Sequence, residues 1–193
     1  MRSIAVFCGS NTGNDPAFSV AAKALGREMA GQQIELVFGG GRIGIMGVVA
    51  DAVLEAGGRV TGVIPSFLHS KEIAHEGLTE LITVDSMHDR KRIMQERAEG
   101  FIALPGGFGT LEELFEMITW AQLGLHQKPI ALFNVAGFYD PLIHFTRSLV
   151  EKGLLTRANH DMLLIGDEAA SLLKQMREYV PAKVPKWIRD DET

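Results

Sequence analysis

Short apolar runs alternate with longer helical patterns along the chain, and this alternation limits the possible folds more than any other feature. The runs predict strands at residues 3–8, 34–38, 59–64, 80–84, 100–104 and 129–133. The patterns predict helices near residues 16–31, 46–56, 87–99, 111–125, 141–152 and 168–180. Apolar strands separated by helices are typical of a parallel sheet covered on both faces. Right-handed crossovers then favour an α/β fold with a doubly wound, Rossmann-like parallel sheet.

The size of the chain predicts a single domain. Its 193 residues, 46% of them hydrophobic, suffice for one well-buried core but are few for two. We expect a Rossmann-like domain over residues 1–180 and a charged, proline-bearing C-terminal tail over residues 181–193. The net charge of −5 argues against a nucleic-acid partner. One cysteine, no signal-like start and no apolar run of membrane-spanning length lead us to expect a cytoplasmic protein with no membrane partner.

A glycine-rich turn, P-G-G-F-G-T-L-E-E over residues 105–113, follows one predicted strand and leads into a helix. Free backbone N–H groups and the helix dipole converge on an anion in this geometry. Glycine lets the backbone approach a phosphate closely. The sequence therefore predicts a phosphate-binding turn, made by Gly106, Gly107, Phe108, Gly109 and Thr110.

Three further loops lie at the same expected edge, over residues 9–13, 39–47 and 85–90. Ligands of such sheets bind beyond the carboxyl ends of the strands, so these loops are expected to converge on one cleft. We expect substrate contacts from Gly9 and Ser10 in the first loop, and from Gly40, Gly41 and Met46 in the second.

Residues 39–44 match the dinucleotide fingerprint G-x-G-x-x-G, but the match is weak evidence. The fingerprint normally follows the first strand and is answered by an acid near the end of the next strand. Here it follows the second predicted strand, and no Asp or Glu occurs between Gly57 and Lys71. Glycines for tight packing remain one explanation, and a loop facing a mononucleotide is favoured over one binding NAD.

Glu113 allows two interpretations. With Thr110 it fits a capping box, in which the hydroxyl bonds forward and the carboxylate bonds back. A carboxylate at the edge of a phosphate site would also repel the ligand unless it had a task there. Glu112 is expected to face solvent.

Arg90 is the predicted cation of the cleft. Ser86 and Asp89 form a capping pair of their own, which makes Asp89 structural. Arg90 shares a helical stripe with Met87 and Met94, so it turns toward the core, where a buried arginine needs an anionic partner. A structural salt bridge and a ligand or catalytic contact both satisfy that need, and the cleft-edge position favours the second.

The neighbours of Arg90 and the metal-binding residue types are less informative. Lys91 is ambiguous and is a candidate phosphate contact, whereas Arg92 is expected at the surface. The six histidines have no metal-ligand spacing, so no metal site is predicted. Cys8, at a strand end, is expected to be a small buried hydrophobe rather than a nucleophile.

These motifs together resemble one known family. The segments V-F-C-G-S (6–10), G-G-G-R-I-G-I-M-G (39–47), M-H-D-R-K (87–91) and P-G-G-F-G-T-L-E-E (105–113) are similar to those of the "Lonely Guy" family. The resemblance covers roughly residues 3–155 and continues through I-T-W-A-Q-L-G (118–124) and Lys128-Pro129. Members are cytokinin riboside 5′-monophosphate phosphoribohydrolases, long mislabelled as lysine decarboxylases.

The resemblance implies a hydrolase that cleaves the N-glycosidic bond of adenosine 5′-monophosphates. It implies Arg90 and Glu113 as catalytic residues. It implies nucleotide binding by Glu72, Lys91, residues 107–110 and Thr119. It also implies a homodimer with active sites near the interface, and neither metal nor cofactor. The alternatives are an AMP nucleosidase acting on unmodified AMP, a pyridoxal-phosphate lysine decarboxylase and a non-catalytic nucleotide sensor.

Overall fold

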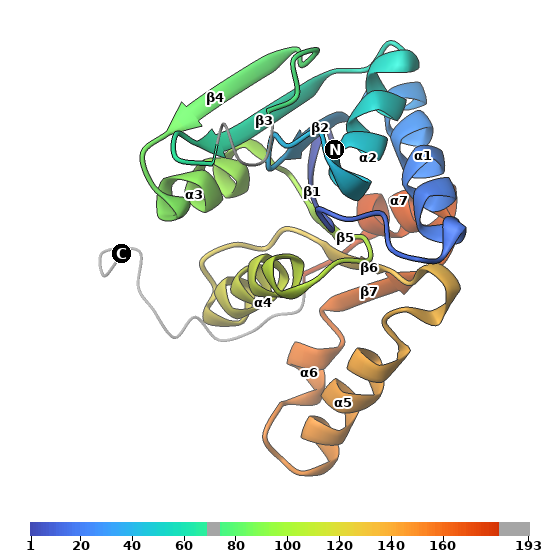
Figure 1. Cartoon of the computed structure of the whole chain (residues 1–193). Coiled ribbons are helices and arrows are strands. Elements are labelled where there is room, and N and C mark those ends of the chain that lie inside the picture. The colour runs from blue at the N-terminus through green and yellow to red at the C-terminus, as the bar shows by residue number, and fades with distance from the viewer. Residues whose placement is uncertain (69–73, 182–193) are drawn as a thin grey trace.

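One parallel sheet organises the molecule (Figure 1), whose computed structural model describes residues 1–68 and 74–181. In that part of the chain seven strands pair in the order β4-β3-β2-β1-β5-β6-β7. Their bounds are β1 Ser3–Phe7, β2 Glu35–Phe38, β3 Val60–Pro65, β4 Glu80–Val84, β5 Phe101–Ala103, β6 Ile130–Phe133 and β7 Leu163–Gly166. The predicted doubly wound, Rossmann-like sheet is confirmed.

Helices cover both faces of this sheet (Figure 1). They are α1 Pro16–Gly31, α2 Gly44–Glu55, α3 Met87–Arg97, α4 Phe108–Leu123, α5 Asp140–Glu151, α6 Arg157–His160 and α7 Ala169–Glu178, with a 3₁₀ turn at Val135–Gly137. Along β1, Ile4 and Val6 pack with α1, α2 and α7, whereas Ala5 and Phe7 pack with α3 and α4. Burying each large apolar side chain contributes roughly 1.5–3 kcal/mol. Strands covered on both faces therefore read as the continuous apolar runs of the sequence.

Local signals set the helix boundaries that matter for the site. The Asp15 side chain accepts a hydrogen bond of 2.9 Å from the N–H of Ala17, and Pro16 occupies the first turn, so α1 starts where predicted. The left-handed Gly124, at φ 83°, ends α4.

The structure adds elements that the sequence did not predict. β7 is a four-residue strand at the sheet edge, with the apolar sequence L-L-I-G but with residues that are half-buried or exposed. α6 has a single turn. No helix in the described part of the chain is long and apolar enough to cross a bilayer.

The sheet topology fixes where a ligand can bind. From β1 the sheet extends through β2, β3 and β4 on one side, and through β5, β6 and β7 on the other. The carboxyl ends of β1 and β5 are therefore the point at which the strand order reverses, where ligands of open α/β sheets bind.

Candidate active site

A pocket of about 290 Å³ opens at this reversal point, among the ends of β1 and β2 and the first turns of α3 and α4. Several predicted site residues line it, and they come from four separate segments: Gly9, Ser10, Met46, Arg90, Gly107, Phe108, Gly109, Thr110 and Glu113. Gly106 lines an adjoining pocket together with Gly9, Ser10 and Gly107. The predicted convergence of the loops is confirmed for these residues.

The glycine-rich turn has the geometry of an anion site. Gly107 is the N-cap of α4, so the N-cap position makes no side-chain hydrogen bond to the backbone N–H groups of the first turn. A Cβ on Gly106 would lie 2.1 Å from Thr110 Oγ1 and 2.8 Å from the Gly9 nitrogen, so this position needs glycine for close packing. A Cβ on Gly107 or Gly109 would meet nothing within 4 Å. Those two glycines therefore leave open space in front of the amides.

The capping-box interpretation of Glu113 is wrong. The helix starts at Phe108, before the predicted residue 111, so Thr110 lies inside the first turn and is 4% exposed. A capping box requires the hydroxyl at the N-cap, and Gly107 holds that position. Glu113 instead lines the pocket.

Arg90 reaches the pocket from α3 and is buried, with 6% of its surface exposed. The predicted capping pair positions its helix: Ser86 Oγ accepts from the N–H of Asp89 at 3.1 Å and donates to Asp89 Oδ2 at 2.6 Å. One terminal nitrogen of the guanidinium donates to the Gly39 carbonyl at 3.2 Å. A Cβ on Gly39 would lie 1.8 Å from that nitrogen. The first glycine of the fingerprint-like loop thus makes room for the arginine.

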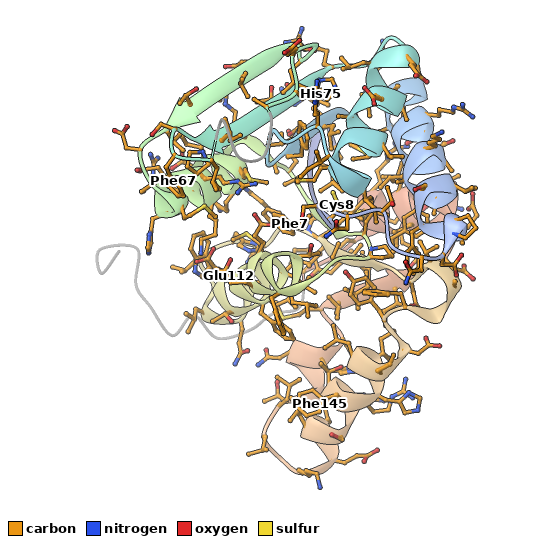
Figure 2. The ribbon with its side chains drawn as sticks, viewed as in Figure 1. Phe7, Cys8, Phe67, His75, Glu112 and Phe145 are labelled. Atoms are coloured by element: carbon orange, nitrogen blue, oxygen red, sulfur yellow. The ribbon has the colours of Figure 1, made fainter. Side chains whose placement is uncertain are left out.

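The other glycines of this loop serve packing. Gly40, at φ +79°, accepts a hydrogen bond of 2.9 Å from the His75 N–H, and Gly41 forms a β-bridge with Ala74. A Cβ on Gly44 would lie 2.2 Å from the Ser10 backbone. Among the described residues, Gly40 and Gly41 do not line the pocket, although both were expected there. Figure 2 shows His75 beside α2 and Cys8 at the end of β1.

Cys8 reports on the electrostatics of the pocket. Burial raises the pKa of its thiol, the charge of Glu113 raises it further, and Arg90 opposes both. The thiol is therefore protonated at neutral pH and is a poor nucleophile, as predicted. Its side chain is half-buried and lines the pocket, so it is less enclosed than expected. The charges of Glu113 and Arg90 both shift the pKa of this thiol, so an acid and a cation lie near Cys8 at the same wall of the pocket.

Two other predicted residues lie away from the pocket. Lys91 Nζ lies 2.5 Å from Glu112 Oε1 and 3.0 Å from Glu116 Oε1. Glu112 is exposed as expected, but it also lines the pocket beside Glu113. Thr119 is exposed on α4, where its hydroxyl donates to the Phe115 carbonyl at 2.7 Å. It lines a separate apolar pocket between α4, α5 and α6. Glu72 lies outside the described residues.

Some lining residues escaped the sequence reasoning. Leu68 follows β3, and Met87 starts α3. Gly39 also lines the pocket, and its sequence position could have indicated this, because it directly follows β2 at the carboxyl edge of the sheet. Leu68 had none, because a single leucine in a loop indicates no function. No group of three or more potential metal ligands occurs among the residues that the structure describes.

Comparison with known proteins identifies the family. Residues 46–176 match the family described as "possible lysine decarboxylase". Cytokinin riboside 5′-monophosphate phosphoribohydrolase LOG2 of Arabidopsis thaliana is 44% identical over 195 residues, covering 100% of this chain and 92% of that protein. The LOG1 enzyme of the same plant is 46% identical over 180 residues, covering 93% and 84%. The LOG protein of Oryza sativa subsp. japonica is 44% identical over 191 residues, covering 99% and 79%.

Solved structures share the fold at low sequence identity. The molybdenum cofactor carrier protein of Chlamydomonas reinhardtii superposes with a TM-score of 0.69 at 21% identity, covering 92% of this chain and 98% of that one. The molybdenum cofactor binding protein of Rippkaea orientalis gives 0.67 at 20% identity, covering 91% and 95%. At such identities the likeness extends to the fold alone. The plant relatives, matched over nearly the whole chain, show that this protein belongs to the Lonely Guy family of cytokinin riboside 5′-monophosphate phosphoribohydrolases.

Proposed function

We propose that the protein hydrolyses the N-glycosidic bond of cytokinin-type adenosine 5′-monophosphates, releasing the free base and ribose 5-phosphate. The observation that carries this proposal is one pocket lined by the uncapped amides of α4, a buried arginine and a carboxylate. The names of the full-length relatives support the same reaction.

The phosphate of the substrate is held by the glycine-rich turn. Amides at the start of α4 and the helix dipole favour an anion in front of Gly107 and Gly109. Binding energy from this remote phosphate supports orientation at the anomeric carbon, which is where the bond breaks.

Glu113 and Arg90 act at the sugar. The C1′–N bond breaks toward an oxocarbenium-like state, and its electron pair leaves with the base. A carboxylate at Glu113 stabilises the positive sugar and takes a proton from the water that attacks C1′. The proton that Glu113 took from the water is then returned, directly or through solvent, to the departing base, which regenerates the carboxylate and completes the hydrolysis. Arg90 keeps the acid ionised and contacts the nucleotide, in this proposal.

Decarboxylation of lysine fits the residues poorly. Pyridoxal phosphate requires a lysine amine for its Schiff base. No lysine is among the described residues that line the pocket, and the Lys91 ammonium is engaged by Glu112 and Glu116. The donor set therefore does not match that cofactor.

The proposal extends to assembly and location. The catalytic unit spans residues 1–180 and works in the cytoplasm as a homodimer with active sites near the interface. Exposed apolar side chains at Phe115 on α4, Leu125 just after it and Phe145 on α5 offer a surface for the second copy. Figure 2 shows Phe145 on α5. Thr119 lines the apolar pocket between α4, α5 and α6, not the pocket of Arg90 and Glu113. In this proposal it therefore reaches the substrate that is bound by the second copy.

Incubation with isopentenyladenosine 5′-monophosphate tests the activity. We expect free base and ribose 5-phosphate in equal amounts by chromatography, and slower release from isopentenyladenosine, which lacks the phosphate. Plain AMP, run in parallel, separates the cytokinin activity from an AMP nucleosidase. A nucleotide that stays bound and intact for hours would indicate a sensor and refute the proposed hydrolysis.

A further inference from the structure

A buried tyrosine from another part of the fold contacts the start of the glycine-rich turn. Tyr139 is 1% exposed, and its hydroxyl donates to the Leu104 carbonyl at 2.7 Å. Leu104 directly follows β5 and precedes Pro105, with which the turn begins. Tyr139 lies 35 residues further along the chain, at the start of α5. Among the described residues, it does not line the pocket of Arg90 and Glu113.

The Leu104 carbonyl needs this donor because the pairing of β1 with β5 ends irregularly beside it. The Leu104 N–H donates to the Phe7 carbonyl at 2.9 Å, as parallel pairing requires. The next bond of a regular ladder would join the Gly9 N–H to the Leu104 carbonyl. Instead, the Gly9 N–H donates to the Pro105 carbonyl at 3.1 Å. A buried carbonyl without a partner is destabilising, and the Tyr139 hydroxyl supplies the donor.

Several contacts hold Tyr139 itself in place. Asn134 Oδ1 accepts from the Tyr139 N–H at 2.7 Å, and Asn134 Nδ2 donates to Asp140 Oδ1 at 2.8 Å. Asn134 directly follows β6, and its N–H donates to the Gly166 carbonyl of β7 at 2.7 Å. The Phe138 ring packs edge-on against the Tyr139 ring, with 4.9 Å between centroids. The carboxyl ends of β6 and β7 therefore fix the position of the hydroxyl.

The hydroxyl of Tyr139 is a donor at neutral pH. Burial raises the pKa of Tyr139, and the neighbouring Cys8 raises it further, so the ring stays protonated. Cys8 lines the pocket of the candidate active site. Tyr139 therefore lies close to the wall of that pocket without being part of it.

The backbone before the turn is thus held at two successive carbonyls. Tyr139 binds that of Leu104, and Gly9 binds that of Pro105. Such restraint matters because glycine has more backbone freedom than any other residue. A Cβ on Gly107 would meet nothing within 4 Å, so packing around this position does little to fix the backbone.

We propose that Tyr139 is a positioning residue, whose hydroxyl fixes the backbone before the glycine-rich turn and so aims the amides of Gly107 and Gly109 at the substrate phosphate. This inference rests on the proposed function and adds to it a residue outside the pocket. Hydrogen-bond donors are most effective when they are already oriented before the ligand arrives. Loss of the hydroxyl should therefore weaken the grip on the phosphate more than it slows the chemistry.

The first experiment removes the hydroxyl alone. We expect Tyr139→Phe to weaken binding of ribose 5-phosphate about tenfold in calorimetry, a ratio of the size that one lost hydrogen bond gives. KM for isopentenyladenosine 5′-monophosphate should rise by a similar factor, while kcat falls by less than about threefold, because the catalytic side chains are unchanged. Wild-type affinity in a folded Tyr139→Phe protein would overturn the inference.

Tyr179→Phe is the matched control. It removes the same atom from the other tyrosine of the chain, which is half-buried at the end of α7. Affinity and KM should stay at wild-type values in this variant. A tenfold loss there as well would show that the effect of Tyr139→Phe is not specific to the turn.

NMR signals of the turn separate positioning from a general loss of stability. We expect the amide signals of Gly107 and Gly109 to shift in ligand-free Tyr139→Phe. Those of Gly57 and Gly153, which follow the ends of α2 and α5, should stay in place. Inorganic phosphate should move the Gly107 and Gly109 signals of wild type, and about ten times more should be needed in the variant. Unmoved turn signals in the ligand-free variant would contradict the positioning role.

A second variant keeps the inference testable if Tyr139→Phe fails to fold. Asn134→Ala keeps the hydroxyl but removes the acceptor of the Tyr139 N–H, so we expect about threefold weaker binding of ribose 5-phosphate. Wild-type affinity together with unmoved Gly107 signals would overturn the inference even without Tyr139→Phe. Added to Tyr139→Phe, Asn134→Ala should cost nothing further. An equal loss in both backgrounds would also contradict the inference, because the two residues would then act independently.

The binding measurements need no turnover, so this inference and the proposed function can fail separately. Wild-type protein might release no base while Tyr139→Phe still binds ribose 5-phosphate more weakly. That result would refute the hydrolysis and leave the role of Tyr139 at a phosphate site standing. Release of base by Tyr139→Phe with wild-type KM would refute the role of Tyr139 and leave the hydrolysis standing.

Discussion

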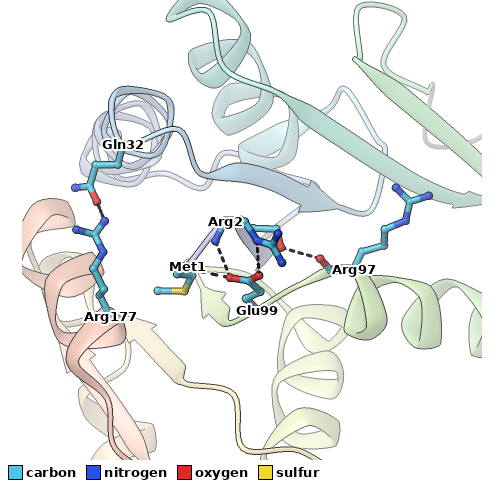
Figure 3. A network of polar contacts seen from close by, with 7 residues as sticks. Met1, Arg2, Gln32, Arg97, Glu99 and Arg177 are labelled. Atoms are coloured by element: carbon cyan, nitrogen blue, oxygen red, sulfur yellow. Dashed lines mark hydrogen bonds and ion pairs between the residues drawn. The ribbon is translucent and has the colours of Figure 1, made fainter.

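The two edges of the sheet use charged residues in opposite ways. At the amino edge, where β1 and β5 begin, Arg2 donates to Glu99 through its backbone N–H at 2.7 Å and its Nε at 3.0 Å (Figure 3). Ser3 Oγ donates to the Arg97 carbonyl at 2.7 Å, and Arg177 bonds Gln32. The Arg2 side chain is 91% exposed. These groups satisfy one another in contact with water.

At the carboxyl edge the arginine is withdrawn from water. Arg90 is 6% exposed, and it lines one pocket with Glu113 and the uncapped amides of α4. Electrostatic interactions are stronger in such a site than at an exposed surface. An exposed arginine such as Arg2 contributes little to stability, whereas the buried Arg90 creates a strong local field in the pocket. The same residue type therefore has different roles at the two edges because its burial differs.

Removing the acid of the carboxyl edge should have the largest effect. We expect Glu113→Gln to lower kcat by about 10²- to 10⁴-fold, since the amide cannot take a proton from water or balance the sugar cation. Ribose 5-phosphate binding, measured by calorimetry, should persist. Glu99→Gln is the matched change at the amino edge and should leave kcat unaltered. Equal activity of Glu113→Gln and wild type would remove Glu113 from the mechanism.

Crowding the arginine should have the next largest effect. In Gly39→Ala the new methyl group would lie 1.8 Å from an Arg90 nitrogen, so the guanidinium must move. We expect kcat to fall by about 10- to 100-fold, and overpacking to cost about 1–3 kcal/mol of stability. Gly31→Ala, at the end of α1, meets nothing within 4 Å and serves as the control. An unchanged kcat in Gly39→Ala would show that the position of Arg90 does not matter.

Alanine substitutions of Gly107 and Gly106 should distinguish an effect on phosphate binding from an effect on packing. Gly107→Ala puts a methyl group into the open space before the amides, so KM should rise about tenfold with little change in Tm. Gly106→Ala meets Thr110 and the Gly9 backbone, so it should lower Tm as well. Thermal unfolding and substrate kinetics on both variants make the test. A Gly107→Ala protein with wild-type KM would place the phosphate elsewhere.

The difference between the edges also explains what the sequence could predict. The six predicted strands are confirmed, and five of them lie inside the sheet, where apolar residues on both faces give continuous runs. β7 was missed although its four residues, L-L-I-G, are apolar, because so short an apolar run does not by itself distinguish a strand from a buried helix segment. The start of α4 at Phe108 was missed because the glycines around it disfavour a helix by intrinsic propensity.

The site could be predicted by segment, but only in part by residue. Glycine loops after strands indicated the correct edge, because parallel strands all end there. Which glycines face the ligand depends on contacts distant in sequence, such as the one between Arg90 and Gly39, 51 residues apart. In the sequence, Gly40 and Gly41 cannot be told from the neighbouring Gly39, yet they pair with the segment after β3 and do not line the pocket. Likewise, nothing local indicates that Lys91 meets Glu112 and Glu116.

The smallest effect is expected at the amino edge, and it depends on pH. The backbone N–H of Arg2 lowers the pKa of Glu99, burial partly opposes this, and the Arg2 side chain lowers it further. A depressed folded pKa adds stability above the pKa of an unfolded glutamate, about 4.3, and that stability is lost as pH falls through the folded pKa.

Glu99→Gln should therefore lower Tm at pH 7 by no more than about 1–3 °C, because an exposed pair contributes less than about 1 kcal/mol. The difference from wild type should shrink as the pH falls through the folded pKa of Glu99, below which both chains carry an uncharged group. Glu76→Gln, an exposed carboxylate elsewhere, controls for net charge. A deficit that is large, or that persists at low pH, would mean that the amino edge holds a buried charge after all, and the contrast between the two edges would fail.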